Sequence, residues 1–214
     1  MKVVVFGATG MVGQGVLREC LLASDVDQVV AVIRTPTGVS HPKLREVPLA
    51  DFADVAPIRD ELAGADACFY CLGISSVGVD EAAYTRVSYD YPMAAARALA
   101  ELDSRTTFVY VSGAGTNLDG RQMWARVKGR TEREIIELLP NGYAFRPGLI
   151  QPKYGVRSKT RWVNALYTLV APAIPLLERA APKYVTSTDR IGQAMLRAAR
   201  VGFPHHIVEN ADLR

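Results

Sequence analysis

A glycine-rich turn lies between a strand pattern and a helix pattern at the start of this chain, and it constrains the fold more than any other feature. The apolar run at residues 2–6 is short and rich in β-branched residues, which is typical of a buried strand. In residues 7–13, glycine recurs at every third position, and apolar residues at helical spacing follow. Glycine in such a turn permits a tight bend and a close backbone approach to a pyrophosphate, while the helix N-terminus offers unpaired N–H groups to the anion. The turn therefore predicts a dinucleotide site.

Position gives the motif its specificity, because turns elsewhere use glycine only for its backbone freedom. A second apolar run, residues 28–33, follows at the distance of one βαβ unit. We therefore expect most residues of the turn to contact the cofactor. They are Gly7, Thr9, Gly10, Met11, Val12 and Gly13.

Strand and helix patterns alternate along the rest of the chain. Strands are predicted over residues 43–49, 67–72, 106–111, 143–146 and 205–209, and helices over residues 55–62, 80–102, 123–139 and 188–200. Pro92 is expected to kink the helix that contains it. This alternation requires crossover connections, so the fold class is α/β, a doubly wound and mostly parallel Rossmann sheet with helices on both faces. We expect a single domain, residues 1–214, in which a small C-terminal segment at about residues 151–185 walls the substrate side.

The composition argues against several other classes of protein. The formal net charge is +3, and the basic residues are scattered except over residues 153–161, so nucleic-acid binding is not expected. Glycine interrupts the N-terminal apolar stretch and no cleavage site follows, which indicates a first strand and not a signal peptide. Cysteines in a chain without a secretory signal indicate a cytoplasmic location. Cys68 and Cys71 have C-x-x-C spacing, but they lie in an apolar run and are predicted to be core thiols.

Arg34 stands at the end of the second predicted strand, where the choice between NAD and NADP is usually made. No Asp or Glu occurs between Val29 and Gly38. A guanidinium can hold a 2′-phosphate with paired hydrogen bonds, whereas a carboxylate would repel it. The sequence thus favours NADP(H) over NAD(H), with assistance from the hydroxyl of Thr35. The alternative is a solvated surface arginine.

A serine and a lysine mark the predicted reaction end of the site. Ser112 follows the fifth strand, and Lys128 comes sixteen positions later on the next helix. Trp124 precedes Lys128 by four residues and therefore lies on the same helix face. The run Arg146-Pro147-Gly148 ends the sixth strand.

Together with the glycine turn, these residues resemble the short-chain dehydrogenase/reductase (SDR) families over about residues 1–150. The match is to the extended and atypical members, including NmrA-like proteins, the flavin/biliverdin reductase type and the NAD-dependent epimerases/dehydratases. The resemblance implies that Ser112 contacts substrate or nicotinamide and that Lys128 holds the nicotinamide ribose. The alternatives are a strand-end cap and a surface lysine.

The resemblance also assigns cofactor contacts at three other strand ends. Asp51 and Phe52 follow the third strand, where the family places the adenine, although Asp51 is equally suited to cap a helix. The other two sets are Cys71, Leu72 and Gly73 beside the ribose, and Pro147, Leu149 and Ile150 along the nicotinamide. Each glycine here is also compatible with an ordinary turn.

Trp124 departs from the family pattern at the position of the catalytic tyrosine. The family has Tyr-x-x-x-Lys, in which the tyrosine exchanges a proton with the substrate oxygen. An indole N–H donates a hydrogen bond but has no accessible acid–base equilibrium. The usual keto-reductase or epimerase mechanism is therefore in doubt.

The uncharged run at residues 162–177 is too short to span a bilayer, and prolines interrupt it. We expect a hydrophobic substrate lid or a subunit contact, in a monomer or a homodimer, with peripheral membrane contact as the alternative. No metal site is predicted, because His41 is isolated and His205 and His206 would point to opposite faces of a strand.

Three functions remain open on the sequence. The first is an NADPH-dependent oxidoreductase that passes hydride to a small, hydrophobic acceptor such as a flavin or quinone, with the proton from solvent. The second is a non-catalytic NADP(H)-sensing regulator, and the third is a nucleotide-sugar epimerase. The third needs the missing tyrosine and usually a longer C-terminal domain.

Overall fold

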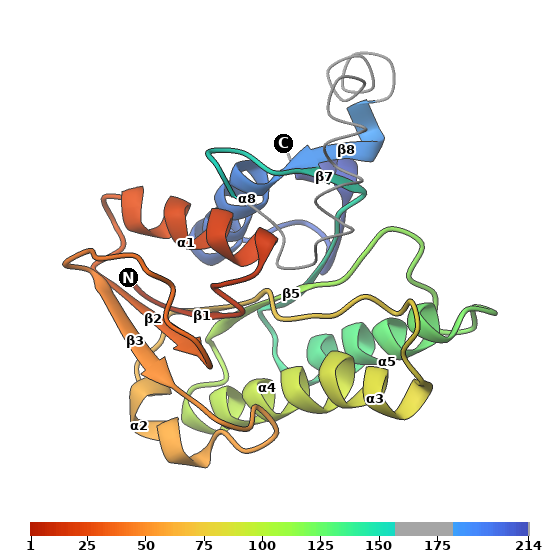
Figure 1. Ribbon diagram of the computed structural model, residues 1–214, viewed down its shortest axis with the longest axis horizontal. Helices are drawn as coiled ribbons and strands as arrows, with labels where there is room; N and C mark the ends of the chain where they lie inside the picture. The colour runs from red at the N-terminus through yellow and green to blue at the C-terminus, as the bar shows by residue number, and fades with distance from the viewer. Residues whose placement is uncertain (157–181, 214) are drawn as a thin grey trace.

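A seven-stranded parallel sheet forms the centre of the computed structural model, which describes residues 1–156 and 182–213 (Figure 1). Its strand order is β3-β2-β1-β4-β5-β6-β9. The strands are β1 (Lys2–Phe6), β2 (Gln28–Ile33), β3 (Leu44–Pro48), β4 (Ala67–Tyr70), β5 (Thr107–Val111), β6 (Gly142–Arg146) and β9 (Ile207–Glu209). The order reverses between β1 and β4, which creates a crevice at the carboxyl ends of these strands. The α/β doubly wound fold predicted from the sequence is confirmed.

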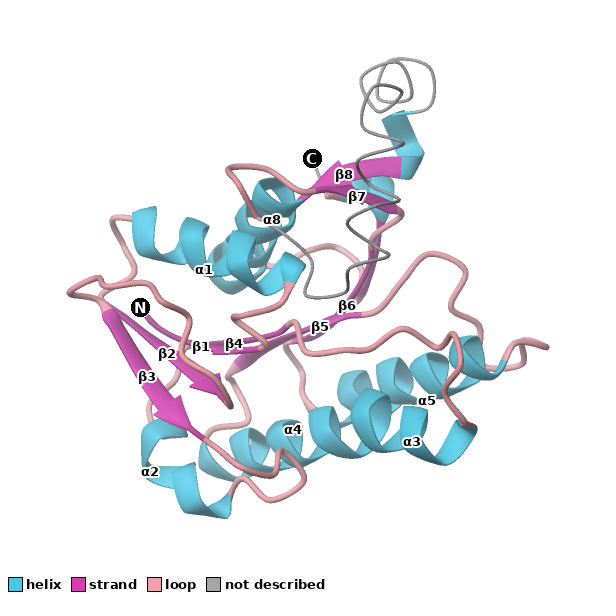
Figure 2. Cartoon of the chain, in the orientation of Figure 1, coloured by secondary structure: helices cyan, strands magenta, loops and turns pink. Residues whose placement is uncertain are grey.

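Helices cover both faces of the sheet (Figure 2). Helices α1 (Met11–Leu22) and α8 (Thr188–Val201) cover one face, and α2 (Arg59–Leu62), α3 (Glu81–Thr85), α4 (Tyr91–Leu102) and α5 (Met123–Leu138) cover the other. Short 3₁₀ turns lie at Ala56–Ile58, Pro182–Tyr184 and Asn210–Asp212. Helices α1 and α8 approach each other closely at Gly15. A Cβ at this position would lie only 2.5 Å from the Thr188 side chain. This close contact fixes α1, whose N-terminus carries the glycine turn.

Two apolar clusters, one on each face, hold the layers together. In β1, Val3 and Val5 belong to the cluster under α1 and α8, whereas Val4 and Phe6 belong to the cluster over α4 and α5. All four side chains are fully buried. Burial on both faces explains why the strands appear in the sequence as continuous apolar runs and not as alternating ones.

The long helix predicted over residues 80–102 is three consecutive pieces. A π-helical turn, Arg86–Asp90, separates α3 from α4. The helical backbone is continuous from Glu81 to Leu102, and Pro92, which has no N–H to donate, lies just after the π-helical turn. The kink predicted at Pro92 stays a prediction.

The histidine pair was also misplaced, because β9 begins only at Ile207. His206 precedes the strand, and its Nδ1 lies 2.8 Å from the carbonyl oxygen of Gly142. Among the described residues, no group of His, Cys, Asp and Glu side chains is arranged to hold a metal ion.

A second, two-stranded sheet was not predicted. β7 (Leu149–Gln151) pairs in parallel with β8 (Val185–Ser187), just beyond the end of β6. No helix in the described part of the chain is long and apolar enough to cross a membrane. The apolar run at residues 162–177 and most of the predicted lid lie outside the described residues.

Candidate functional site

A cavity of about 630 Å³ opens at the carboxyl ends of β1, β2, β4 and β5. This is the crevice at which the strand order reverses. The lining residues come from the glycine turn, from four strand ends and from α5. They are Gly7, Thr9, Gly10, Met11, Val12, Val32, Ile33, Arg34, Thr35, Phe52, Cys71, Leu72, Gly73, Ile74, Ser75, Val111, Ser112 and Lys128.

The glycine turn leaves room that no other residue would leave. Gly7 has a φ of +79°, and a Cβ there would lie 2.6 Å from the backbone nitrogen of Leu72. Gly10 is the N-cap of α1 and makes no side-chain hydrogen bond to the N–H groups of the first turn, and Gly10, Met11 and Val12 all line the cavity. These features fit a pyrophosphate on the helix N-terminus.

Gly13 has a different role from the one predicted, because it does not line the cavity. A Cβ on Gly13 would lie only 2.0 Å from the carbonyl oxygen of Gly7. Its missing side chain therefore lets the turn fold back on α1.

Arg34 and Thr35 line the cavity at the end of β2, together with Phe52. The exposed Arg34 guanidinium carbon lies 5.7 Å from the centre of the Phe52 ring. Asp51 does not line the cavity. Its carboxylate accepts hydrogen bonds from the Ala53 N–H, at 3.0 Å, and from the Arg86 guanidinium, at 3.1 Å. Asp51 therefore closes a turn and does not cap a helix, because the next helical segment begins at Ala56 with Val55 as its N-cap. Its predicted contact with the adenine stays a prediction.

The end of β4 contributes Cys71, Leu72 and Gly73, as predicted, and also Ile74 and Ser75, which the sequence analysis missed. Both Cys68 and Cys71 are free thiols. Burial raises the pKa of each thiol above its ordinary value, and neither can supply a proton near neutral pH.

Ser112 lines the cavity but its hydroxyl proton is already engaged. Its Oγ lies 3.0 Å from Oγ1 of Thr116, and Thr116 donates its own proton to the carbonyl oxygen of Gly113 at 2.8 Å. A hydroxyl has only one proton, so Ser112 must donate to Thr116. The Ser112 oxygen therefore offers lone pairs, not a proton, to the cavity.

Lys128 reaches the cavity from α5. Its Nζ donates to the carbonyl oxygens of Ser112, at 2.9 Å, and Val111, at 3.3 Å. Burial lowers the pKa of Lys128 from 10.5 to about 8, and the negative charge of Glu132 opposes this shift. The ammonium is thus rigidly held and close to its titration point at physiological pH.

Trp124 is not among the residues that line the cavity. Its half-buried side chain packs on the apolar cluster over α4 and α5. A Cβ on Gly115 would meet its Cη2 atom at 3.6 Å, so the ring lies against the loop after β5. Trp124 fills space beside the site and supplies no group to it.

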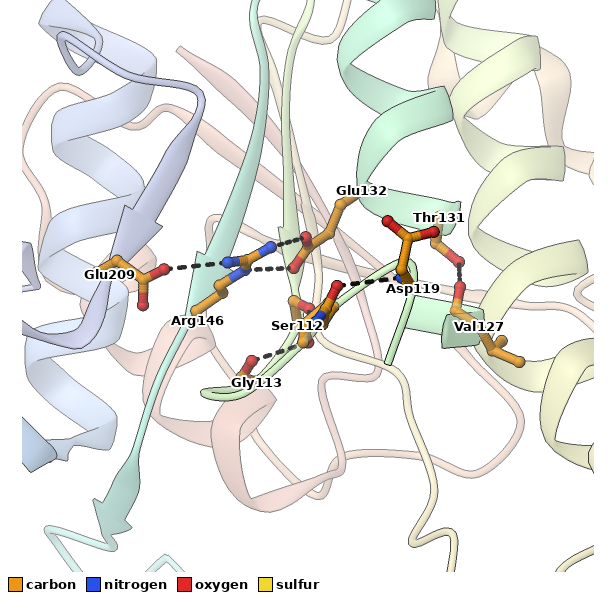
Figure 3. Close-up of polar contacts among 10 residues, drawn as sticks. Ser112, Gly113, Asp119, Val127, Thr131, Glu132, Arg146 and Glu209 are labelled. Carbon is orange, nitrogen blue, oxygen red and sulfur yellow. Dashed lines mark hydrogen bonds and ion pairs between the residues drawn. The ribbon is translucent and has the colours of Figure 1, made fainter. Parts of the chain in front are cut away.

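Arg146 forms ion pairs that connect several elements around the site. Its guanidinium donates to both carboxylate oxygens of the buried Glu132, at 2.6 and 3.0 Å, and to Glu209 at 3.1 Å (Figure 3). Next to it, the carbonyl oxygen of Pro147 accepts the Ala114 N–H at 2.9 Å. These contacts connect β6 to α5, to β9 and to the loop that follows Ser112.

The predicted nicotinamide contacts of Pro147, Leu149 and Ile150 are not seen in the cavity lining. Leu149 and Ile150 belong to β7, and Ile150 packs on the apolar cluster under α1 and α8. Their contacts with the nicotinamide stay a prediction.

Sequence reasoning also missed Val32, Ile33 and Val111, which line the cavity at strand ends. The rule that ligands bind beyond parallel strands could have included them. Glu132 had a detectable signal as well, because it follows Lys128 by four residues and so shares its helix face.

Comparison with known proteins agrees with this geometry. The model of the NAD(P)H-binding family matches residues 7–191. The chain belongs to this family. Its fold is that of the atypical SDR and NAD epimerase/dehydratase-like Rossmann proteins.

Relatives by sequence come from fungi. The protein FMP52-2, mitochondrial, of Scheffersomyces stipitis is 32% identical over 165 residues, which cover 75% of this chain and 69% of that protein. The leucinostatins biosynthesis cluster protein T of Purpureocillium lilacinum is 30% identical over 141 residues, or 63% of this chain. The match spans 51%, about half, of that second relative.

Solved structures share the fold at low sequence identity. A short-chain type dehydrogenase/reductase from Mycobacterium ulcerans has a TM-score of 0.69 at 16% identity, covering 99% of this chain and 89% of that one. The Bordetella bronchiseptica enzyme WbmH, solved with NAD⁺, has a TM-score of 0.68 at 18% identity, covering 97% and 73%.

Proposed function

We propose that this protein is an NADPH-dependent oxidoreductase that transfers hydride to a small, flavin- or quinone-like acceptor. The observation that carries the proposal is the charge pattern of the cavity. Its described lining holds a cation near each end, Arg34 and Lys128, and no carboxylate. Such a cavity suits a ligand with several negative charges, which NADPH has.

Arg34 supports the preference for NADPH over NADH. It lies at the end of β2 beside the Phe52 ring, so one guanidinium can contact both an adenine and a 2′-phosphate. A charge-assisted hydrogen bond contributes about 1.5–3 kcal/mol, or roughly 10- to 150-fold in affinity.

Replacing this arginine tests the preference. Arg34→Ser should weaken NADPH binding by about 10- to 100-fold and leave NADH binding nearly unchanged, as measured by calorimetry. Arg45→Ser is the matched control, because Arg45 is also exposed, lies on the neighbouring strand β3 outside the cavity lining, and pairs with Glu61 of α2. Equal affinity of the wild-type protein for both cofactors would contradict an NADPH preference.

The cavity lining supports the acceptor class. No tyrosine of the described residues lines it. The cavity is therefore poorly suited to an acceptor, such as a ketone, whose alkoxide must be protonated by a phenol. Flavins and quinones form reduced products whose charge is delocalised. Incubation with NADPH and a panel of flavins, quinones and simple ketones should give turnover with the first two groups.

A second candidate is a non-catalytic protein that senses NADP(H). It is favoured by the position of Trp124, which leaves the cavity without the family's proton donor. Tight NADPH binding with no turnover on any acceptor would favour this candidate and overturn the oxidoreductase.

A further inference from the structure

The reaction end of the cavity has few groups that can give up a proton. Three titratable side chains are found among the described residues of the lining: Arg34, Cys71 and Lys128. A guanidinium does not titrate in proteins, and the Cys71 thiol has a raised pKa because it is buried. Lys128 is the remaining candidate.

Ser112 does not compete with Lys128 as a donor. Its proton lies on the hydrogen bond to Thr116, whose own proton is held by the Gly113 carbonyl. Proton release from Ser112 to a bound molecule would break its bond to Thr116. In this arrangement Ser112 donates to Thr116 and offers only lone pairs to the cavity.

The Lys128 ammonium is held by two hydrogen bonds and has a third proton that these bonds do not use. Two of its protons are directed at the carbonyl oxygens of Val111 and Ser112. An ammonium has three donors, and Nζ belongs to a side chain that lines the cavity, so the third is available to a bound molecule.

Several charged and titratable groups surround Lys128, and some of them affect its pKa. Glu132 faces it from the next turn of α5, and Arg146 of β6 neutralises much of that carboxylate. From β5, the Tyr110 ring lies 5.5 Å from Nζ, and its hydroxyl donates to the Ser88 carbonyl. Burial, and to a smaller extent Tyr84 of α3, holds the pKa of Tyr110 well above its usual value. Burial outweighs the attraction of Glu132 and brings the lysine pKa to about 8.

We propose that Lys128 is the proton donor of the reaction and replaces the tyrosine that is absent at position 124. This inference rests on the proposed oxidoreductase function. The acceptor gains a hydride, with two electrons, at one atom, and the negative charge develops on a conjugated oxygen or ring nitrogen. The oxygen or nitrogen that bears the negative charge forms a bond to a proton of the Lys128 ammonium as the N–H bond at Nζ breaks. The reduced cofactor is oxidised, Lys128 becomes a neutral amine, and water returns its proton.

Two substitutions separate proton donation from simple binding. Lys128→Arg keeps the positive charge and hydrogen bonds but cannot release a proton, so NADPH affinity should stay within about 3-fold while hydride transfer slows by about 100-fold or more. Lys128→Ala should be equally slow, and added methylammonium should restore part of the rate. Lys43→Arg, which alters a lysine bonded to the Ala23 carbonyl outside the cavity, is the control.

A direct titration provides a readout that does not depend on turnover. In protein with ¹³C-labelled lysine and no added cofactor, the Lys128 ε-carbon should titrate near pH 8, well below the ordinary range of lysine. The wild-type rate should fall above that pH, because a neutral amine has no acidic proton to give. This decline should be absent in Lys128→Arg.

The outcomes separate the two proposals. If the wild-type protein reduces an acceptor and Lys128→Arg does so equally well, only the role of Lys128 is overturned. The same conclusion follows if Lys128 in the protein without cofactor stays charged above about pH 10, the ordinary range of lysine. If the wild-type protein binds NADPH but reduces nothing, the proposed function itself fails.

Discussion

The two ends of the cavity are built in different ways. At the glycine turn, the site is made of backbone: N–H groups at the start of α1 and the space that Gly7 leaves beside Leu72. At the β5–α5 end, it is made of side chains, chiefly Lys128 and the Ser112–Thr116 pair. A backbone-built site can hold the same ligand through large changes of sequence, whereas one side-chain replacement alters the chemistry of the other end. The loss of the tyrosine at Trp124 is therefore compatible with retained binding.

Gly13→Ala should disrupt the glycine turn, which forms the backbone-built end of the cavity. The new Cβ would lie 2.0 Å from the Gly7 carbonyl oxygen, so the turn or α1 must move. We expect a loss of about 3 kcal/mol in the free energy of unfolding, a fall in Tm of about 10 °C, and no measurable cofactor binding.

Gly73→Ala is the control for the stability part of this prediction alone, because a Cβ there meets no protein atom within 4 Å but Gly73 lines the cavity. Thermal unfolding monitored by circular dichroism, followed by calorimetric titration with NADPH, gives both quantities. An alanine at position 13 that preserved Tm and affinity would show that the turn adjusts easily, and the contrast between the two ends would be lost.

Glu132→Gln, at the β5–α5 end of the cavity, should lower the free energy of unfolding by less than Gly13→Ala does. Arg146 keeps its contact with Glu209, so we expect a loss of about 2 kcal/mol in unfolding free energy. Because the Glu132 charge raises the pKa of Lys128, its removal should lower that pKa below about 8. The lysine would then lose its proton at a lower pH, and any rate that depends on the charged form would decline earlier.

Labelled-lysine NMR measures the shift directly, and Glu137→Gln is the matched control because that exposed carboxylate lies on the same helix. A Lys128 titration that did not move in Glu132→Gln would show that the ion pair with Arg146 has no electrostatic effect on the site.

Trp124→Tyr should have the smallest effect. The ring lies against Gly115 outside the cavity lining, so a phenol there is not expected to reach the acceptor. We expect rates within about 2-fold of wild type and a stability loss of about 1 kcal/mol from imperfect packing. Substantial new ketone reductase activity would instead show that only the phenol was missing from this end.

Local signals explain which parts were predictable. The strands and the glycine turn could be predicted because a short apolar run and a glycine spacing are properties of neighbouring residues. Arg34 and Lys128 were found for the same reason, since each has a fixed place relative to a strand or helix. Their presence in the cavity lining agrees with the prediction, while their contacts with a cofactor remain to be measured.

The contacts that could not be predicted involve partners distant in sequence. Leu149 and Ile150 pair with β8, more than thirty residues later. Asp51 pairs with Arg86, which belongs to another helical segment. Nothing within a local window indicates these pairings. The cofactor contacts that the family resemblance assigns to these three residues stay predictions.

The contact between α1 and α8 bears on the order in which the protein can be assembled during synthesis. The helix that follows the glycine turn ends at Leu22, but its packing partner begins only at Thr188. As the chain emerges from the ribosome, β1 and β2 can pair early, while Val16 and Leu17, fully or almost fully buried in the finished protein, have no partner helix. The N-terminal part of the chain therefore exposes this apolar face until α8 has been synthesised. Substitutions in α8 such as Gly192→Val, whose Cβ would lie 2.8 Å from the Glu19 side chain of α1, should affect yield in cells more than the cofactor affinity of the folded protein.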